Sequence, residues 1–255
     1  MTRVIKIGGR PQNDPRLGDA ISSGWNGGGD GGVVLVHGGG DEVTTLQAAL
    51  GETSAFVDGR RVTSARDIDL VRMALSGSAN KRLVALLVAS GIDAVGLSGE
   101  DASLISASPI DVERLGRVGI PKTINVAFLR HLLSGGYLPV ISPVSRDAGG
   151  TAGDALNVNG DDAAAAIAIA MGAAELLLVA DVAGVLCDGR VIPELTTDEA
   201  RQLLIGGTAA GGMRAKLQAG LRAIEGGVPC VRISDLSAIS DRGRGTILRC
   251  IGELT

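Results

Sequence analysis

The sequence predicts an α/β protein whose mainly parallel sheet is covered by helices on both faces. Short apolar segments alternate with segments of helical periodicity along the chain, a pattern typical of β/α crossovers. The segment Val33-Val34-Leu35-Val36 is wholly apolar, as expected for a strand buried on both faces. Right-handed crossovers bring the carboxyl ends of such strands to one edge of the sheet, where open α/β sheets bind ligands.

The expected strands are short runs rich in valine, isoleucine and leucine, most of them followed by a turn signal. They cover residues 4–7, 33–36, 94–97, 104–110, 137–141, 176–180, 230–233 and 246–249. A separate hairpin is expected over residues 54–63, because Asp58-Gly59 is a favoured two-residue turn.

The expected helices have amphipathic spacing or capping signals. They cover residues 14–22, 41–50, 65–89, 125–134 and 197–204; another, which residues 157–162 open, ends near Gly172, and a further helix contains Lys216. The longest of them, with small residues at Ala74, Gly77 and Ala79, is a candidate subunit interface. Either Asn159 or Asp161 can cap the alanine-rich helix that ends near Gly172.

Composition excludes several classes of function. The net charge is -4 and aromatic residues make up 2% of the chain, which argues against a nucleic-acid or anionic-membrane surface. No run of 18 apolar residues occurs and the start does not resemble a signal peptide, so we expect a cytoplasmic protein. The three cysteines lack metal-ligand spacing; we expect them in the core, and we expect no metal held by side chains.

Lys6 is one of only four lysines, and it lies inside the first apolar strand, just before Gly8-Gly9. Burying an ammonium group is costly unless an anion meets it, and glycines let backbone N–H groups approach that anion. This pattern indicates a phosphate-binding lysine. The same six residues also fit an edge-strand lysine that points into water.

The second strand runs into His37-Gly38-Gly39-Gly40 and then into a helix. Free N–H groups and a helix dipole at this place favour an anionic ligand. An oxyanion hole of an α/β hydrolase would have the same glycines, but the sequence contains no G-x-S-x-G nucleophile elbow.

Arg60 and Arg61 follow the hairpin turn, where a planar guanidinium can hold a carboxylate; a solvated charge pair fits equally well. Two other motifs resemble nucleotide loops only superficially. Gly27, Gly29 and Gly32 satisfy G-x-G-x-x-G but precede a strand, and proline instead of glycine precedes Lys122 in a segment that resembles a Walker A loop.

Six motifs in a fixed order resemble the amino acid kinase family. They are Lys6-Ile7-Gly8-Gly9, His37-Gly38-Gly39-Gly40, Gly59-Arg60-Arg61-Val62-Thr63, Asn157-Val158-Asn159-Gly160-Asp161, Asp181-Val182-Ala183-Gly184-Val185 and Gly212-Met213-Arg214-Ala215-Lys216. The resemblance covers essentially the whole chain. It implies a three-layer αβα sandwich, with residues 1–171 as the lobe for the amino-acid substrate and dimerisation and residues 172–255 as the ATP-binding lobe.

Within the family, the chain is most similar to the members that phosphorylate N-acetyl-L-glutamate. The implied reaction transfers the γ-phosphoryl group of ATP, with Mg2+, to the side-chain carboxylate of that substrate in arginine biosynthesis. The chain begins almost at its first strand, without the N-terminal helix of arginine-inhibited hexameric relatives. By resemblance we therefore expect a homodimer that arginine does not inhibit.

The resemblance also implies a role for individual residues. Lys6 and Lys216 match the lysines that stabilise the transferring phosphoryl group, and Asp161 matches the aspartate that holds them. The residues matched to substrate binding are Gly39, Gly40, Arg61 and Asn157. The residues matched to nucleotide binding are Gly8, Gly9, Asp181, Gly184, Val185, Leu186, Thr208, Ala209, Ala210 and Gly212.

Two alternatives stay open at this point. One is a related kinase that acts on aminoadipate or glutamate attached to an acidic carrier protein, in lysine or ornithine biosynthesis. The acidic composition of the chain does not favour it, because such a partner calls for a basic rim. The other is a non-catalytic nucleotide-binding regulator, although Lys6, Asp161 and Lys216 are all present. The acyl group of the substrate, acetyl or succinyl, also stays open.

Overall fold

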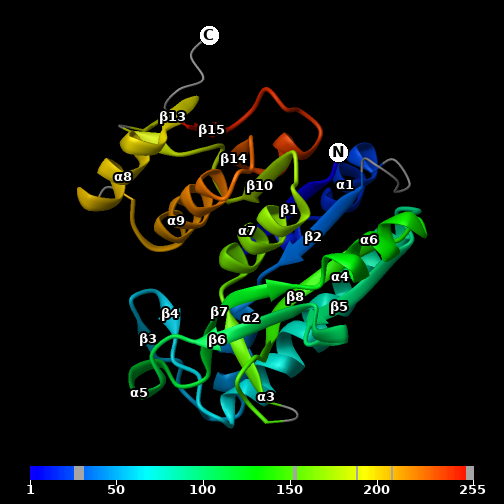
Figure 1. Ribbon diagram of the computed structural model, residues 1–255, viewed down its shortest axis with the longest axis vertical. Coiled ribbons are helices and arrows are strands. Elements are labelled where there is room, and N and C mark those ends of the chain that lie inside the picture. Colours follow the sequence, from blue (N-terminus) through cyan, green and yellow to red (C-terminus); the bar gives the residue numbers. More distant parts are fainter. Residues whose placement is uncertain (26–31, 152–153, 188, 208, 251–255) are drawn as a thin grey trace.

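A computed structural model describes residues 1–25, 32–151, 154–187, 189–207 and 209–250, and within them one eleven-stranded sheet forms the centre of the fold (Figure 1). Ten strands form its continuous path, and β5 (Ala94–Gly99) pairs with β8 beside that path. The order is β13 (Glu194–Thr196), β15 (Thr246–Arg249), β14 (Val231–Ser234), β10 (Glu175–Val179), β1 (Arg3–Ile7), β2 (Val33–His37), β8 (Leu138–Asp147), β6 (Ile105–Pro109), β7 (Val118–Ile124) and β9 (Ala155–Val158).

The sheet is mainly parallel. Strand β1 at its centre pairs in parallel with both β2 and β10, and β8 pairs in parallel with β2, β5 and β6. Antiparallel pairs join β14 to β15, β6 to β7 and β8 to β9. The carboxyl ends of β1 and β2 therefore lie together, and the two glycine turns that follow them are neighbours.

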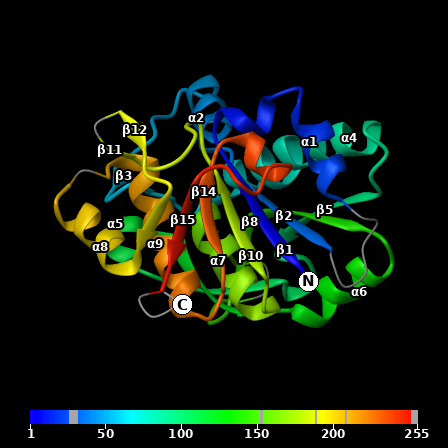
Figure 2. The ribbon, with the colours of Figure 1, turned by 90° about the horizontal axis from the view of Figure 1, so that it is seen from above.

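Helices cover both faces of this sheet. Successive residues of β1 point to opposite sides: Val4 packs in the core that contains α7 and α9, and Ile5 packs in the core that contains α1 and α4. Figure 2 shows the strands between these two helical layers. The helices are α1 (Leu17–Gly24), α2 (Gly40–Ala49), α3 (Asp67–Val71), α4 (Asn80–Ala89), α5 (Val112–Leu115), α6 (Val126–Ser134), α7 (Gly160–Met171), α8 (Thr197–Ile205) and α9 (Gly211–Glu225). The predicted three-layer αβα sandwich is confirmed.

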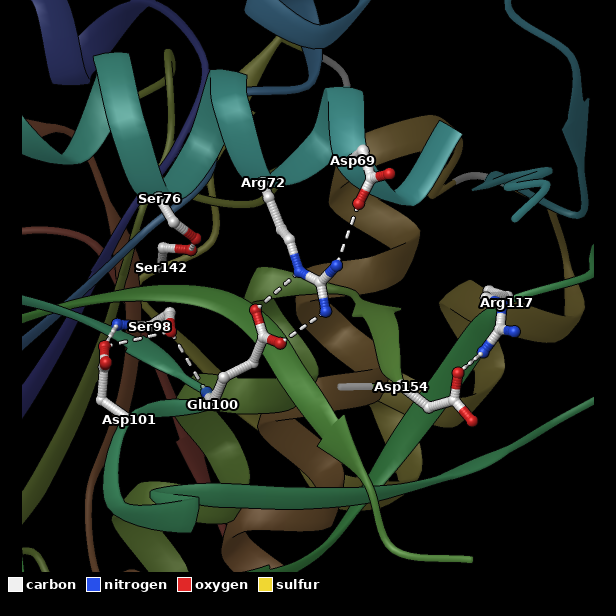
Figure 3. A network of polar contacts seen from close by, with 9 residues as sticks. All are labelled: Asp69, Arg72, Ser76, Ser98, Glu100, Asp101, Arg117, Ser142 and Asp154. Carbon is white, nitrogen blue, oxygen red and sulfur yellow. Dashed lines mark hydrogen bonds and ion pairs between the residues drawn. The ribbon is translucent and has the colours of Figure 1, made fainter. Parts of the chain in front are cut away.

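The expected helix over residues 65–89 is continuous but has a π-helical centre, η3 (Arg72–Ala79), between α3 and α4. Figure 3 shows how polar contacts fasten this segment to the sheet. Arg72 bonds Glu100 (2.7 Å) and Asp69 (2.9 Å), and the hydroxyls of Ser76 and Ser142 lie 2.7 Å apart. π-Helical turns are rare in proteins, and many of those known lie at functional sites.

Several sequence expectations need correction. Strands β7, β9 and β13 were not foreseen, and β7 contains the second half of the segment that was rejected as a Walker A loop. Cys187 and Cys250 are exposed and Cys230 is half-buried, so the expected core positions for cysteine were wrong. The glycine-rich residues 26–31 and Thr208 lie outside the described residues. Within the described chain, helices are too short or too polar to cross a membrane.

Candidate active site

Two lysines from opposite ends of the chain meet one aspartate. Lys6 lies in β1, Asp161 in the first turn of α7 and Lys216 in α9. Asp161 Oδ1 is 3.0 Å from Lys6 Nζ and 3.6 Å from Lys216 Nζ, and all three side chains are buried. The alternative of an exposed edge-strand lysine at position 6 is therefore wrong, because β1 is a central strand and its lysine is buried.

Local sequence explains this arrangement. Asn159 caps α7, and its side-chain oxygen accepts a hydrogen bond from the Asp161 backbone amide at 2.8 Å. This bond fixes the position of Asp161 in the first turn of the helix. Gly8 and Gly160 leave room for the lysine: a Cβ atom at Gly8 would lie 2.4 Å from Lys6 Nζ, and one at Gly160 would lie 3.2 Å from Lys6 Cε. Of the two caps considered, Asn159 is the residue that caps the helix.

The charge of this cluster is set by burial and by mutual attraction. Burial would raise the pKa of Asp161, but the Lys6 and Lys216 ammonium groups outweigh it and hold that pKa below its ordinary value. Burial, together with repulsion from Lys6, lowers the pKa of Lys216 to about 8. Two cations share one carboxylate, so the cluster attracts a further anion.

A cavity of about 220 Å³ opens beside this cluster. It is smaller than the roughly 300–1,000 Å³ of pockets for drug-sized ligands, which suits a small substrate. The predicted residues that line it are Lys6, Gly8, Gly9, Gly39, Gly40, Arg61, Asn157 and Asp161. Lining residues that the sequence did not single out include Phe56, Leu75 and Pro143.

Arg61 is already engaged by protein groups at the rim of this cavity. Its guanidinium donates to the Gly40 carbonyl (2.7 Å), to Gln47 Oε1 (2.7 Å) and to Thr44 Oγ1 (2.8 Å). It also lies 4.8 Å from the centre of the Phe56 ring, within cation–π range. These bonds connect the hairpin, β3 (Phe56–Val57) and β4 (Arg60–Arg61), to the glycine turn at the start of α2.

A second, apolar pocket of about 300 Å³ lies in the C-terminal third of the chain. Four of the predicted nucleotide residues line it: Val185, Leu186, Ala209 and Ala210. Val182, inside the motif matched to the nucleotide site, also lines it, and two other lining residues, Leu203 and Met213, were missed. Met213 belongs to the motif Gly212-Met213-Arg214-Ala215-Lys216. An apolar side chain so close to Lys216 in sequence could have been predicted to line the nucleotide pocket.

The remaining predicted nucleotide residues line neither pocket. Asp181 is half-exposed, 3.9 Å from Arg10, and a Cβ atom at Gly9 would lie 3.6 Å from its carboxylate. Gly184 is packed, because a Cβ atom there would meet Val191 at 2.6 Å. Gly212, in the first turn of α9, faces open space. In the described part of the chain, no three His, Cys, Asp or Glu side chains are grouped to hold a metal ion.

His37 lies buried beneath the Gly38–Gly40 turn. Its Nδ1 atom is 2.7 Å from the Gly38 carbonyl oxygen, and its Nε2 atom is 3.1 Å from Asn80 Nδ2. Since the carbonyl can only accept and the Asn80 amide donates, Nδ1 carries the proton and Nε2 accepts. A neutral His37 thus connects the turn to Asn80, whose amide also donates to the Val140 carbonyl at 2.9 Å.

This neutral histidine predicts a pH-dependent stability. Burial, with the nearby Lys6 charge, lowers the pKa of His37 from 6.5 to about 4. As pH falls through this window the unfolded chain binds a proton that the folded chain does not, so the free energy of unfolding falls, by about 3 kcal/mol in total. Urea unfolding across the window should show that His37→Gln loses this slope and that His131→Gln, at an exposed position in α6, keeps it. Equal slopes in both variants would contradict the assignment.

The fold and this site are those of a small-molecule kinase: an αβα sandwich with a buried two-lysine cluster beside a small polar cavity and, in its C-terminal third, an apolar pocket. The chain belongs to the amino acid kinase family, whose profile matches residues 1–235. It is 41% identical over 242 residues to an acetylglutamate kinase of Chloroflexus aurantiacus, covering 94% of each chain. It is 43% identical over 201 residues to that of Geobacillus kaustophilus, covering 79% of this chain and 77% of the relative.

A solved structure has the same fold. The protein smu.665 from Streptococcus mutans UA159 superposes with a TM-score of 0.84 at 26% identity, covering 97% of this chain and 98% of that one. The profile match and the relatives at 41–43% identity confirm the family suggested by the six motifs.

Proposed function

We propose that this protein transfers the γ-phosphoryl group of ATP to the side-chain carboxylate of N-acetyl-L-glutamate, forming N-acetyl-L-glutamyl 5-phosphate for arginine biosynthesis. The observation that carries the proposal is the buried Lys6–Asp161–Lys216 cluster beside a cavity of amino-acid size. The acetylglutamate kinases to which the chain is 41–43% identical support the choice of substrate.

The chemistry needs positioning and charge neutralisation more than proton transfer. A carboxylate is already ionised at neutral pH, so its oxygen can attack the γ-phosphorus without a general base. The new O–P bond forms as the bond to the ADP oxygen breaks. Lys6 and Lys216 would neutralise the charge on the transferring group, and the Gly8 and Gly9 amides would donate to its oxygens.

Each substrate has its own part of the chain. We assign binding of the amino-acid substrate to Gly39, Gly40, Arg61 and Asn157, which all lie in residues 1–171. We assign binding of the nucleotide base to the apolar pocket, whose lining residues all lie in residues 172–255. A bound α-carboxylate would take over a donor of Arg61 that now serves a protein acceptor. Mg2+ would arrive on the ATP phosphates, as is usual for this ion.

The proposal includes a homodimer in the cytoplasm, where ATP is available. The segment α3–η3–α4 exposes Met73 and Val88, both more than half accessible, on a helix at the edge strand β5. Exposed apolar side chains on one long helix are consistent with a subunit interface.

Trapping the product tests this function. The purified protein, Mg-ATP, N-acetyl-L-glutamate and hydroxylamine should yield an acyl hydroxamate in equal amount to ADP. ATP binding without hydroxamate would contradict the free amino acid as substrate and favour a carrier-linked one. N-Succinyl-L-glutamate, compared in the same assay, decides the acyl preference.

The lowered pKa of Lys216 predicts the shape of the pH profile. Because that pKa is about 8 in the free protein, kcat/KM for Mg-ATP should fall about tenfold per pH unit above it, as the ammonium loses its proton. Bound phosphates favour the charged amine, so kcat itself should hold to higher pH. Lys216→Arg, which stays charged, should remove the alkaline fall even if its rate is low. An unchanged profile in Lys216→Arg would contradict the assignment.

A further inference from the structure

Asp162, the residue after Asp161, forms a second buried charge cluster next to the first. Its carboxylate is almost fully buried and contacts two guanidinium groups. Asp162 Oδ2 accepts from Arg60 Nη2 at 2.8 Å, and Asp162 Oδ1 accepts from Arg222 Nη2. The three residues come from the hairpin strand β4, from α7 and from α9.

The two arginines belong to different halves of the site. Arg60 lines the amino-acid cavity, together with Phe56, Gly59 and Arg61 of the same hairpin. Arg222 lies on α9, further along the helix that presents Lys216 to Asp161. Asp162 therefore connects a wall of the amino-acid cavity to the helix that carries a phosphoryl-binding lysine.

Both side chains and backbone hold the hairpin in position. Strands β3 and β4 pair with each other, in a sheet separate from the central one, and just beyond β4 the backbone of Thr63 bonds Leu115 and Arg117. Arg61 connects the hairpin to α2, and Arg60 connects it to Asp162. Of these two connections, the one through Arg60 is the one that reaches α9.

The cluster carries a surplus positive charge. Arg60 Nη1 is buried and, among the described residues, has no hydrogen-bond partner. Two guanidinium groups share a single carboxylate, so a positive charge is left over. Arg60 lines the amino-acid cavity, so this surplus charge favours an acid bound there.

We infer that Asp162 is a positioning residue that couples the amino-acid cavity to nucleotide binding, by holding the hairpin to α9 through Arg60 and Arg222. The inference rests on the proposed function in one respect, that the nucleotide binds beside Lys216. When the nucleotide binds and orders α9, the contacts of Asp162 with Arg222 and Arg60 also order the hairpin. An ordered hairpin favours binding of the amino-acid substrate, and because coupling between two binding sites is reciprocal, each substrate then tightens the binding of the other.

Hydrogen exchange with the nucleotide alone tests this without reference to the amino-acid substrate. Mg2+ with a non-hydrolysable ATP analogue should slow amide exchange in hairpin residues 56–61 of the unaltered protein by about fivefold or more. Asp162→Asn should lose this effect while still binding the analogue. Arg222→Gln should also lose it, and because Arg222 is partly exposed, this variant is a second test if Asp162→Asn does not fold.

The matched control is Glu225→Gln, which removes another ion pair of α9, that with Arg201. It should keep the full slowing in the hairpin. A merely structural Asp162 would lower the melting temperature and leave the analogue-dependent slowing intact. That result, or a hairpin that does not respond to the analogue in the unaltered protein, would overturn the inference.

The reciprocal measurement separates this inference from the proposed function. Saturating N-acetyl-L-glutamate should tighten analogue binding about fivefold or more in the unaltered protein and leave it nearly unchanged in Asp162→Asn. If the acid binds but both proteins respond equally, the coupling through Asp162 is wrong and the proposed function stands. If the acid does not bind at all, the proposed substrate is wrong, and the exchange experiment still decides the role of Asp162.

Discussion

Lys6→Met is expected to lower kcat by about 100- to 1000-fold while the protein remains folded, the usual loss when one preorganised donor to a developing charge is removed. Methionine has a similar length and fills the same buried space beside Gly8 and Gly160. Asp161 keeps Lys216 as a partner, so the cluster retains a charge pair. The loss should therefore appear in turnover, measured as ADP release at saturating substrates.

Two comparisons isolate the role of Lys6. Lys216→Met should show a loss of similar size, because both ammonium groups contact Asp161 and serve the same phosphoryl group. Lys122→Met, at an exposed position in β7, should keep full activity. Near-normal kcat in both Lys6→Met and Lys216→Met would refute the proposed mechanism.

Asp161→Asn is expected to reduce the free energy of unfolding by about 3–5 kcal/mol, because two buried ammonium groups then lose their common counter-charge. The amide is nearly the same size as the carboxylate, so packing is preserved and the change reports charge. The variant should also be nearly inactive, since the lysines are no longer held together. The midpoint of urea unfolding measures the stability change.

An exposed aspartate provides the control for that variant. Asp198 pairs with Arg201 on the surface of α8, and exposed pairs contribute little, so Asp198→Asn should change the free energy of unfolding by less than about 1 kcal/mol. If Asp161→Asn were as stable as Asp198→Asn, the cluster would be solvated and not the buried site described above.

The sequence predicted the parts of the fold that depend on strand alternation. Val4 and Ile5 point to opposite cores because strand side chains alternate, and β1, β2 and β10 were located nearly to the residue. Lys6 could be singled out because a lysine inside an apolar strand needs an anion, whereas the role of Lys216 came from the family motif. Their meeting at Asp161, however, came from the order of family motifs, since residues so far apart in sequence are joined only by the tertiary structure.

Other features have no local signal. Strand β9 (Ala155–Val158) is too short to show alternation, and its pairing with β7 and β8 decides its conformation. Met213 and Leu203 look like ordinary helix residues until α8 and α9 bring them to one pocket. Asp162 is the second of two acidic residues in the first turn of α7. Carboxylates are common at helix N-termini, so the sequence gives no sign of its contacts. Its two arginines come from distant segments, and no spacing rule connects them.

The most direct test of the proposed reaction follows an oxygen atom. N-Acetyl-L-glutamate labelled with 18O in its side-chain carboxylate is incubated with Mg-ATP and the protein, hydroxylamine cleaves the acyl phosphate, and the phosphate released is examined by 31P NMR. If the carboxylate attacks the γ-phosphorus, each phosphate carries one 18O, because hydroxylamine breaks the bond between carbonyl carbon and that oxygen. Phosphate without 18O would mean that water had attacked ATP, which would contradict carboxylate phosphorylation at the Lys6–Asp161–Lys216 site.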